Sequence, residues 1–149
     1  MFALNLPAFE YKIRQHEGKN QIFDPRRRRF VALTPEEWVR QHFVNYLIAE
    51  KGFPAGRLSN ECNIVLNGQK RRCDTVLYDE NLKPVVIIEY KAPEITVSQT
   101  IFNQIAAYNM VLKVKYLIVS NGLKHYCCRI NYESQKVDYI DTIPDYKDL

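Results

Sequence analysis

Residues 71–92 constrain the fold of this chain more than any other segment. They contain two apolar runs, Cys73–Tyr78 and Val85–Ala92, joined by the polar segment Asp79–Pro84. Both runs are rich in β-forming residues, and the linker consists of turn-forming residues. Two such runs joined by a short polar link predict an antiparallel hairpin. The hairpin in turn predicts which side chains face each other.

The expected register brings two carboxylates together. If the turn is centred between Asn81 and Leu82, Asp74 lies opposite Glu89, and directly opposed residues have Cβ atoms roughly 5 Å apart. Lys91 points to the same face as Glu89, because strand side chains alternate. Buried like charges repel and need a partner, and a hard cation with oxygen ligands is a natural one. The ammonium can orient a water or offset charge on a phosphate.

These residues alone leave two interpretations of Glu89 and Lys91 open. Exposed pairs of this kind are common in proteins and contribute little energy. The aliphatic run before Glu89 indicates instead that the strand is buried, and the register with Asp74 favours a functional site. The rest of the chain has to decide between a surface pair and a site.

The flanking sequence predicts helices on either side of this hairpin. Thr34 as N-cap, Pro35 in the first turn and Glu37 closing a capping box predict a helix start. This helix is expected to end near Lys51-Gly52. Apolar residues at spacings of three and four predict a second helix over Thr96–Lys113.

Further strands complete a mixed sheet. Asn67-Gly68 is a strong hairpin signal and joins the run before it to the strand that carries Asp74. Tyr116–Ser120 reads as a buried strand, and a helical crossover before it predicts parallel pairing with the Glu89 strand. Residues 30–33 read as an apolar lead-in to the first helix, and the acidic C-terminal segment is expected to fray.

The composition is that of one globular domain spanning residues 1–149. The chain has 149 residues, of which 46% are hydrophobic. No apolar run approaches ~18 residues, and the N-terminus lacks a secretion signal. The cysteines contain no Cys-x-x-Cys pair and read as reduced core residues of a cytoplasmic protein without membrane contact. They are Cys62, Cys73, Cys127 and Cys128.

Charge is distributed unevenly along the chain. The net charge of +4 is mild, but Phe9–Leu33 holds seven Lys or Arg against three Asp or Glu. The run Arg26, Arg27, Arg28 and Arg29 lies in this segment. Such a basic region can contact a phosphate backbone. From charge alone, a solvated arginine-rich loop is the favoured interpretation.

Several motifs, taken in order, resemble the N-terminal nuclease domain of type I restriction enzyme R (restriction) subunits, a branch of the PD-(D/E)xK nuclease superfamily. They are Ile22–Pro25, Leu33–Gln41, Pro84–Pro93, Gln104-x-x-x-Tyr108-Asn109 and Val119–Gly122. The resemblance implies an α/β fold, namely a restriction-endonuclease-like mixed β-sheet flanked by helices. It also implies a hydrolase that cleaves DNA phosphodiester bonds with Mg²⁺ or Mn²⁺. Cys73 stands where the superfamily often has proline.

The resemblance also implies roles for single residues. Asp74 and Glu89 would hold the metal, joined by the Tyr90 carbonyl and by Glu37, which could equally be only a helix cap. Lys91 would position the attacking water. Two further residues, Gln104 and Tyr108, would orient that lysine or contact the DNA backbone, and the four arginines of residues 26–29 would grip phosphates without reading sequence.

One departure from the restriction subunits concerns their motor. The chain contains no Gly-x-x-x-x-Gly-Lys-Ser/Thr loop, so we expect no ATP-driven translocation by these residues. The chain would then act alone or with a motor or specificity subunit of a restriction system, and a homodimer is compatible with cleavage of both strands. The alternative hypothesis is a DNA-binding or assembly module that does not cleave.

Overall fold

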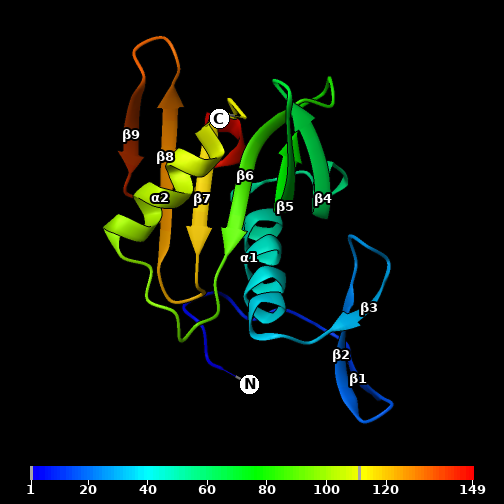
Figure 1. The fold of residues 1–149 in the computed structure, drawn as a ribbon. Helices are drawn as coiled ribbons and strands as arrows, with labels where there is room; N and C mark the ends of the chain where they lie inside the picture. Colours follow the sequence, from blue (N-terminus) through cyan, green and yellow to red (C-terminus); the bar gives the residue numbers. More distant parts are fainter. Residues whose placement is uncertain (1, 111) are drawn as a thin grey trace.

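The computed structural model describes residues 2–110 and 112–149, with the side chains of Leu66 and Tyr108 outside that description. The centre of the fold is a six-stranded mixed sheet with strands in sequence order (Figure 1). All neighbouring pairs are antiparallel except β6 and β7, which are parallel as expected from the crossover. The strands are β4 (Leu58–Leu66), β5 (Gln69–Tyr78), β6 (Pro84–Tyr90), β7 (Tyr116–Ser120), β8 (His125–Asn131) and β9 (Lys136–Ile140).

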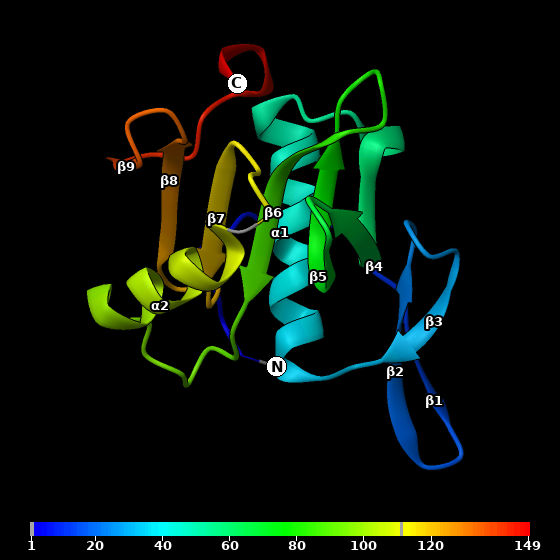
Figure 2. The ribbon, with the colours of Figure 1, turned by 45° about the horizontal axis from the view of Figure 1, so that its top comes forward.

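Two helices pack on opposite faces of this sheet (Figure 2). Helix α1 (Pro35–Lys51) buries a stripe that includes Phe43 against one face, where Ile88 lies. Helix α2 (Gln99–Met110) buries Phe102 against the other face, where Ile87 lies. Adjacent residues of β6 therefore serve two hydrophobic cores, because strand side chains alternate. The expected α/β class, a mixed sheet with helices against it, is confirmed.

Local chemistry sets the ends of both helices. The Thr34 hydroxyl accepts a hydrogen bond from the Glu37 N–H (3.1 Å), and Gly52 ends α1 with φ 73°, both as predicted. The second helix is shorter than the expected Thr96–Lys113. The Ser98 hydroxyl accepts from the Ile101 N–H (3.2 Å), and α2 begins at Gln99, three residues later than the apolar pattern suggested.

A small three-stranded antiparallel sheet stands beside the start of α1 (Figure 1). It consists of β1 (Ile13–His16), β2 (Lys19–Asp24) and β3 (Arg29–Ala32). The prediction that residues 30–33 are only a lead-in to the helix was wrong. Phe30 pairs with Phe23 across β2 and β3, with ring centroids 5.4 Å apart, so apolar packing makes this segment a strand.

The predicted hairpins are present. Asn67 and Gly68 have φ 52° and 75°, the left-handed values that a two-residue hairpin turn needs. Thr75 pairs with Ile88, which is the register expected for the Asp74 hairpin. The register shifts only near the turn, between Leu77 and Tyr78.

The C-terminal segment packs against the domain, which corrects the expectation that it frays. Ile143 is buried in the core on the α1 side of the sheet. The Tyr146 hydroxyl accepts a hydrogen bond from Arg57 (2.8 Å), and Asp145 lies 3.6 Å from Lys51 Nζ. A short 3-10 helix, η2 (Tyr146–Asp148), follows. Apolar and ionic contacts thus hold a segment whose composition alone suggested mobility.

The four cysteines are free thiols, as predicted. Cys127 belongs to the core under α1 and Cys128 to the core under α2, so the adjacent pair does point to opposite faces. Burial raises the pKa of both Cys73 and Cys127 to about 12. Among the described helices, none is long and apolar enough to cross a membrane.

Candidate metal and catalytic site

The hairpin of β5 and β6 places Asp74 beside Glu89. The ladder runs through Thr75 and Ile88, and the next position on each strand is Asp74 and Glu89. The Asp74 side chain takes part in the pairing directly, since its Oδ2 accepts a hydrogen bond from the Tyr90 N–H (2.9 Å). We refer to Asp74 and Glu89 as the carboxylate pair. Its geometry follows from strand register, as the sequence predicted.

The electrostatics of the carboxylate pair are unfavourable without a cation. Burial raises the pKa of Glu89 to about 7, and both the charge of Asp74 and a hydrogen bond between the two carboxyl groups add to this rise. Lys91 opposes it. Near neutral pH the Glu89 carboxyl is therefore partly protonated when no other cation is bound. In the described part of the chain, neither carboxylate forms an ion pair with a basic side chain.

Lys91 lies at the end of β6, where the chain leaves the sheet. Its N–H donates to the Ser120 carbonyl (2.9 Å), which anchors it beside the end of β7. The Asn121 amide donates to the Ile95 carbonyl (2.8 Å) and ties down the loop that follows. The positive charge of Lys91 lowers the pKa of Glu89, against the effect of burial. The structure thus brings Asp74, Glu89 and Lys91 together.

Tyr90 contributes only its backbone to the carboxylate pair. Its side chain points to the opposite face, where the hydroxyl donates to Thr75 Oγ1 (3.0 Å) and the ring is 3% exposed. The Tyr90 N–H is the donor to Asp74 described above, and its carbonyl was predicted as a metal ligand. Tyr90 therefore fixes the relative position of β5 and β6 from both sides of the sheet.

Arg40 is a neighbour of the pair that sequence reasoning missed. Its Nη1 donates to the Asp74 carbonyl (3.2 Å), its Nη2 donates to Glu61 Oε1 (2.6 Å), and its guanidinium lies 5.8 Å from the centre of the Tyr90 ring. Arg40 stands three residues after Glu37 on α1, and residues three apart share a helix face. That spacing was the available signal.

Glu37 belongs to a separate set of charges, which we call the arginine–carboxylate network. Its carboxylate accepts hydrogen bonds from Arg27 (2.5 Å) and Gln41 (3.0 Å) and lies 3.6 Å from Arg40 Nε. Binding a metal would require Glu37 to leave these partners. The network consists of Asp24, Arg27, Glu37, Arg40, Glu61 and Arg72.

The structure divides the run of four arginines that was predicted to contact DNA. Arg26 donates to the Ala55 carbonyl (2.6 Å), and Arg27 is held between Asp24 and Glu37. Arg28 and Arg29 are exposed to solvent. Arg27 is therefore used inside the fold and Arg26 only through one guanidinium nitrogen, whereas Arg28 and Arg29 remain available to an external partner.

The two residues predicted on the second helix are not joined to the pair by any described contact. Gln104 is exposed on α2, and no hydrogen bond in the described part of the chain joins it to Lys91. Tyr108 lies in α2, and its side chain falls outside the described residues. Glu89 and Ile87 are two residues apart on β6 and therefore point to the same face of the sheet. Because Ile87 packs under α2, the Glu89 carboxylate and α2 lie on the same side of the sheet.

The donors of the carboxylate pair fit a hard cation. Among the described residues, no group of three or more His, Cys, Asp or Glu side chains could hold a metal ion. The site offers two carboxylates and the Tyr90 carbonyl. Mg²⁺ binds through one or two carboxylates, with water and substrate phosphate completing its coordination. An all-oxygen set with a raised pKa at Glu89 therefore suits Mg²⁺ or Mn²⁺ better than a softer metal.

Comparisons with known proteins agree on one family. Residues 35–144 match the family model described as the type I restriction enzyme R protein N terminus. A fragment assigned to an HsdR subunit of a type I restriction enzyme from Vibrio vulnificus YJ016 has a similar fold, with a TM-score of 0.51 and 17% identity. The similarity covers 75% of this chain and 24% of that fragment. No curated protein matches significantly. The chain belongs to the type I restriction enzyme R protein N-terminal family.

Proposed function

We propose that this chain is a Mg²⁺-dependent deoxyribonuclease of the PD-(D/E)xK type. The observation that carries the proposal is the carboxylate pair itself. Asp74 and Glu89 are brought together on buried strands, Lys91 is their basic neighbour, and burial with mutual repulsion raises the pKa of Glu89 to about 7. A fold gains nothing from such an arrangement unless a ligand compensates it. The family of the chain, that of a type I restriction enzyme subunit, supports DNA as the substrate.

The residues of the site have separate roles in this proposal. Asp74, Glu89 and the Tyr90 carbonyl hold the metal. When bound, Mg²⁺ supplies a more acidic water and offsets charge on the scissile phosphate. Lys91 orients the attacking water and stabilises negative charge that develops on the phosphate. The Tyr90 N–H holds the Asp74 carboxylate in place.

Other predicted residues act around this centre. Gln104 and Tyr108 on α2 orient Lys91 or contact the DNA backbone once DNA is bound. Glu37 either joins the metal from α1 or keeps its present role of holding Arg27 and Arg40. Arg40 keeps the Asp74 backbone in position through its hydrogen bond to the carbonyl.

Partners follow from the family rather than from the site. We propose DNA and the other subunits of a restriction system as partners, because the family is named for a subunit of such an enzyme. A cytoplasmic location and a homodimer stay predictions. The alternative function is a DNA-binding or assembly module that does not cleave. It is favoured by the exposed position of Gln104, which has no described contact with Lys91.

The decisive experiment is cleavage of supercoiled plasmid with Mg²⁺ or Mn²⁺, beside Lys91→Ala prepared identically. We expect metal-dependent nicking by the wild type and a loss of roughly 10²–10⁴-fold in the variant. Single-stranded DNA is the second substrate. Equal activity of the wild type and Lys91→Ala would mean that the cleavage does not depend on the proposed site. If neither protein cleaves but both bind DNA, the non-cleaving module is the better account.

A further inference from the structure

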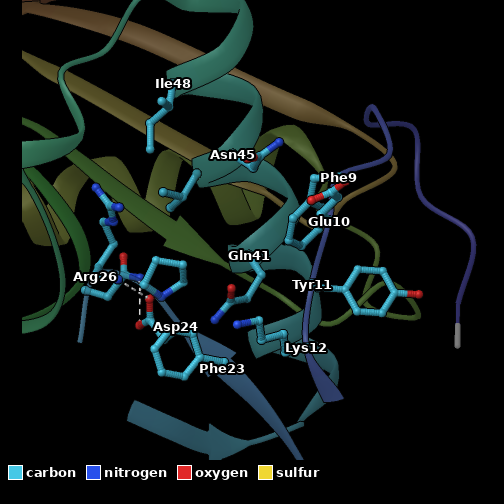
Figure 3. A pocket seen from close by; sticks show the side chains of 13 residues that line it. Phe9, Glu10, Tyr11, Lys12, Phe23, Asp24, Arg26, Gln41, Asn45 and Ile48 are labelled. Carbon is cyan, nitrogen blue, oxygen red and sulfur yellow. Dashed lines mark hydrogen bonds between the residues drawn. The ribbon is translucent and has the colours of Figure 1, made fainter. Parts of the chain in front are cut away.

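A large pocket lies away from the carboxylate pair, between the N-terminal segment and the outer face of α1. Its volume is about 700 Å³. The walls come from residues 9–12, residues 23–26 and the α1 positions 41–48, together with Asn60 of β4 (Figure 3). The family match begins at residue 35, so two of these walls lie outside the matched region. We call this cavity the N-terminal pocket.

Aromatic rings form the sides of the N-terminal pocket. Phe9 and Phe23 lie on different sides of Gln41 (Figure 3). The Phe9 ring is fixed by an edge contact with His42 (4.7 Å between ring centroids), and the Phe23 ring is fixed by Phe30 (5.4 Å). Rings held in this way offer flat surfaces at little entropic cost. Such surfaces stack well on nucleobases.

The floor and rim of the pocket are polar. The Asn45 amide lines the pocket and forms no hydrogen bond within the described part of the chain, so a donor and an acceptor remain for a ligand. Gln41 uses its Nε2 on Glu37 (3.0 Å), which leaves its carbonyl. Lys12 lies 6.0 Å from the centre of the Phe23 ring, and Arg26 is held at the rim by the Ala55 carbonyl.

A buried chain of hydrogen bonds connects this pocket with the hairpin of the carboxylate pair. Asn60 lines the pocket and donates to Asp24 (3.1 Å), and its carbonyl accepts from the Thr75 hydroxyl (2.8 Å). Thr75 in turn accepts from the Tyr90 hydroxyl (3.0 Å). Thr75 and Tyr90 are the immediate neighbours of Asp74 and Glu89. The pocket is thus linked through Asn60 of β4 to the two strands that carry the candidate catalytic residues.

We propose that the N-terminal pocket binds the base of an unpaired nucleotide, with its phosphate held by Lys12 and Arg26. Amide groups that both donate and accept match the edge of a nucleobase, the rings supply stacking, and the volume lies in the range of small-molecule sites. This inference rests on the proposed function, because the nucleotide is taken to belong to the DNA substrate. It adds a subsite that accepts an unstacked base.

The experiment measures binding without cleavage. A short fluorescein-labelled single strand of thymidylates is titrated with the protein in EDTA, beside the same strand with abasic positions. We expect the abasic strand to bind about 5- to 150-fold more weakly, the range given by one stacked base. Asn45→Leu and Phe23→Ala are expected to remove this difference. Val65→Ala, which removes an exposed apolar side chain of β4 outside the pocket, is expected to keep it.

The outcomes separate the pocket from the proposed nuclease. Equal binding of both strands by the wild type, or an unchanged difference in Asn45→Leu, would overturn the pocket proposal even if the protein cleaves DNA. A base-dependent difference that persists in Lys91→Ala supports the pocket even if no nuclease activity is found. Competition by thymidine monophosphate would show that the pocket takes a free nucleotide. Competition only by a strand would assign it to the substrate, and both results support base binding.

Discussion

Two groups of buried and half-buried carboxylates occur in this fold, and they differ in whether the protein itself supplies them with arginine partners. Asp24, Glu37 and Glu61 each meet at least one arginine in the arginine–carboxylate network. The carboxylate pair, Asp74 and Glu89, has no such partner among the described residues. Burial opposes ionisation in both groups, yet hydrogen bonds from Arg27 and Asn60 lower the pKa of Asp24, whereas the pKa of Glu89 is raised to about 7.

The difference separates structure from function. A buried carboxylate that its own fold neutralises stabilises the protein from within, as Asp24 does by tying β2 to Arg27 and Asn60. A buried pair that the fold leaves partly uncompensated destabilises the free protein and favours a ligand that brings positive charge. Carboxylates therefore stabilise the fold in one region and favour ligand binding in the other, and only their partners distinguish the two cases.

Removing an arginine from the network should have the largest effect on folding. Arg27→Ala leaves Asp24 and Glu37 buried with fewer partners, and breaking a buried pair costs about 3–5 kcal/mol. Urea denaturation measures the free energy of unfolding. Arg29→Ala, two residues away and exposed, is the matched control and should change it by less than about 0.5 kcal/mol. Similar losses in both variants would contradict the division of the arginine run.

Metal binding should stabilise the carboxylate pair and leave the network unaffected. At a concentration a hundred times Kd, Mn²⁺ or Mg²⁺ should stabilise the wild type by about 2.7 kcal/mol, seen as a rise in Tm. Asp74→Asn should lose that rise, because it removes one anionic ligand. In Glu37→Gln the rise should persist, since the Glu37 carboxylate is already engaged by Arg27 and Gln41. Loss of the rise in Glu37→Gln would instead make Glu37 a metal ligand.

The pH dependence of stability should have opposite signs for the two groups. Glu89 has a folded pKa of about 7, above its ordinary value of 4.5, so the metal-free protein should lose stability as pH rises from 4.5 through 7. Asp24 has a lowered pKa, and its contribution should be lost only as pH falls below 3.8. Chemical denaturation in EDTA across this range, beside Glu89→Gln, measures the first effect. An equal decline in Glu89→Gln would assign it to another group.

Sequence reasoning reached the carboxylate pair but not the network, for a physical reason. Asp74 and Glu89 lie on strands joined by a short turn, so register alone sets their approach. Asp24, Glu37 and Glu61 come from three separate elements, and their contacts with the arginines depend on how β2, α1 and β4 pack. No local periodicity encodes that packing. The apolar residues of β3 were interpreted as a lead-in to the first helix. They form a strand because Phe30 packs on Phe23 of β2, a contact that the local sequence does not reveal.

The same limit applies to the cavity and to the charged surface. Residues of the N-terminal pocket come from segments with weak signals, so the sequence suggested a basic loop where the structure has a pocket wall. Helix ends and hairpin turns were predictable, because Thr34, Gly52 and Asn67-Gly68 act on their nearest neighbours. The packing of the C-terminal segment was not predictable, since Ile143 and Tyr146 are fixed by residues distant in sequence.

The smallest expected effect concerns the exposed half of the arginine run. If Arg28 and Arg29 contact phosphates, replacing both by alanine should weaken DNA binding and reduce the slope of log K against log salt by about one for each lost contact. Lys147→Ala removes an exposed charge from the acidic C-terminal segment and should leave the slope unchanged. The slope matters more than the affinity, because it counts ions released and does not depend on stacking or metal binding. An unchanged slope in the Arg28 and Arg29 double variant would mean that this exposed half of the run contacts no phosphate.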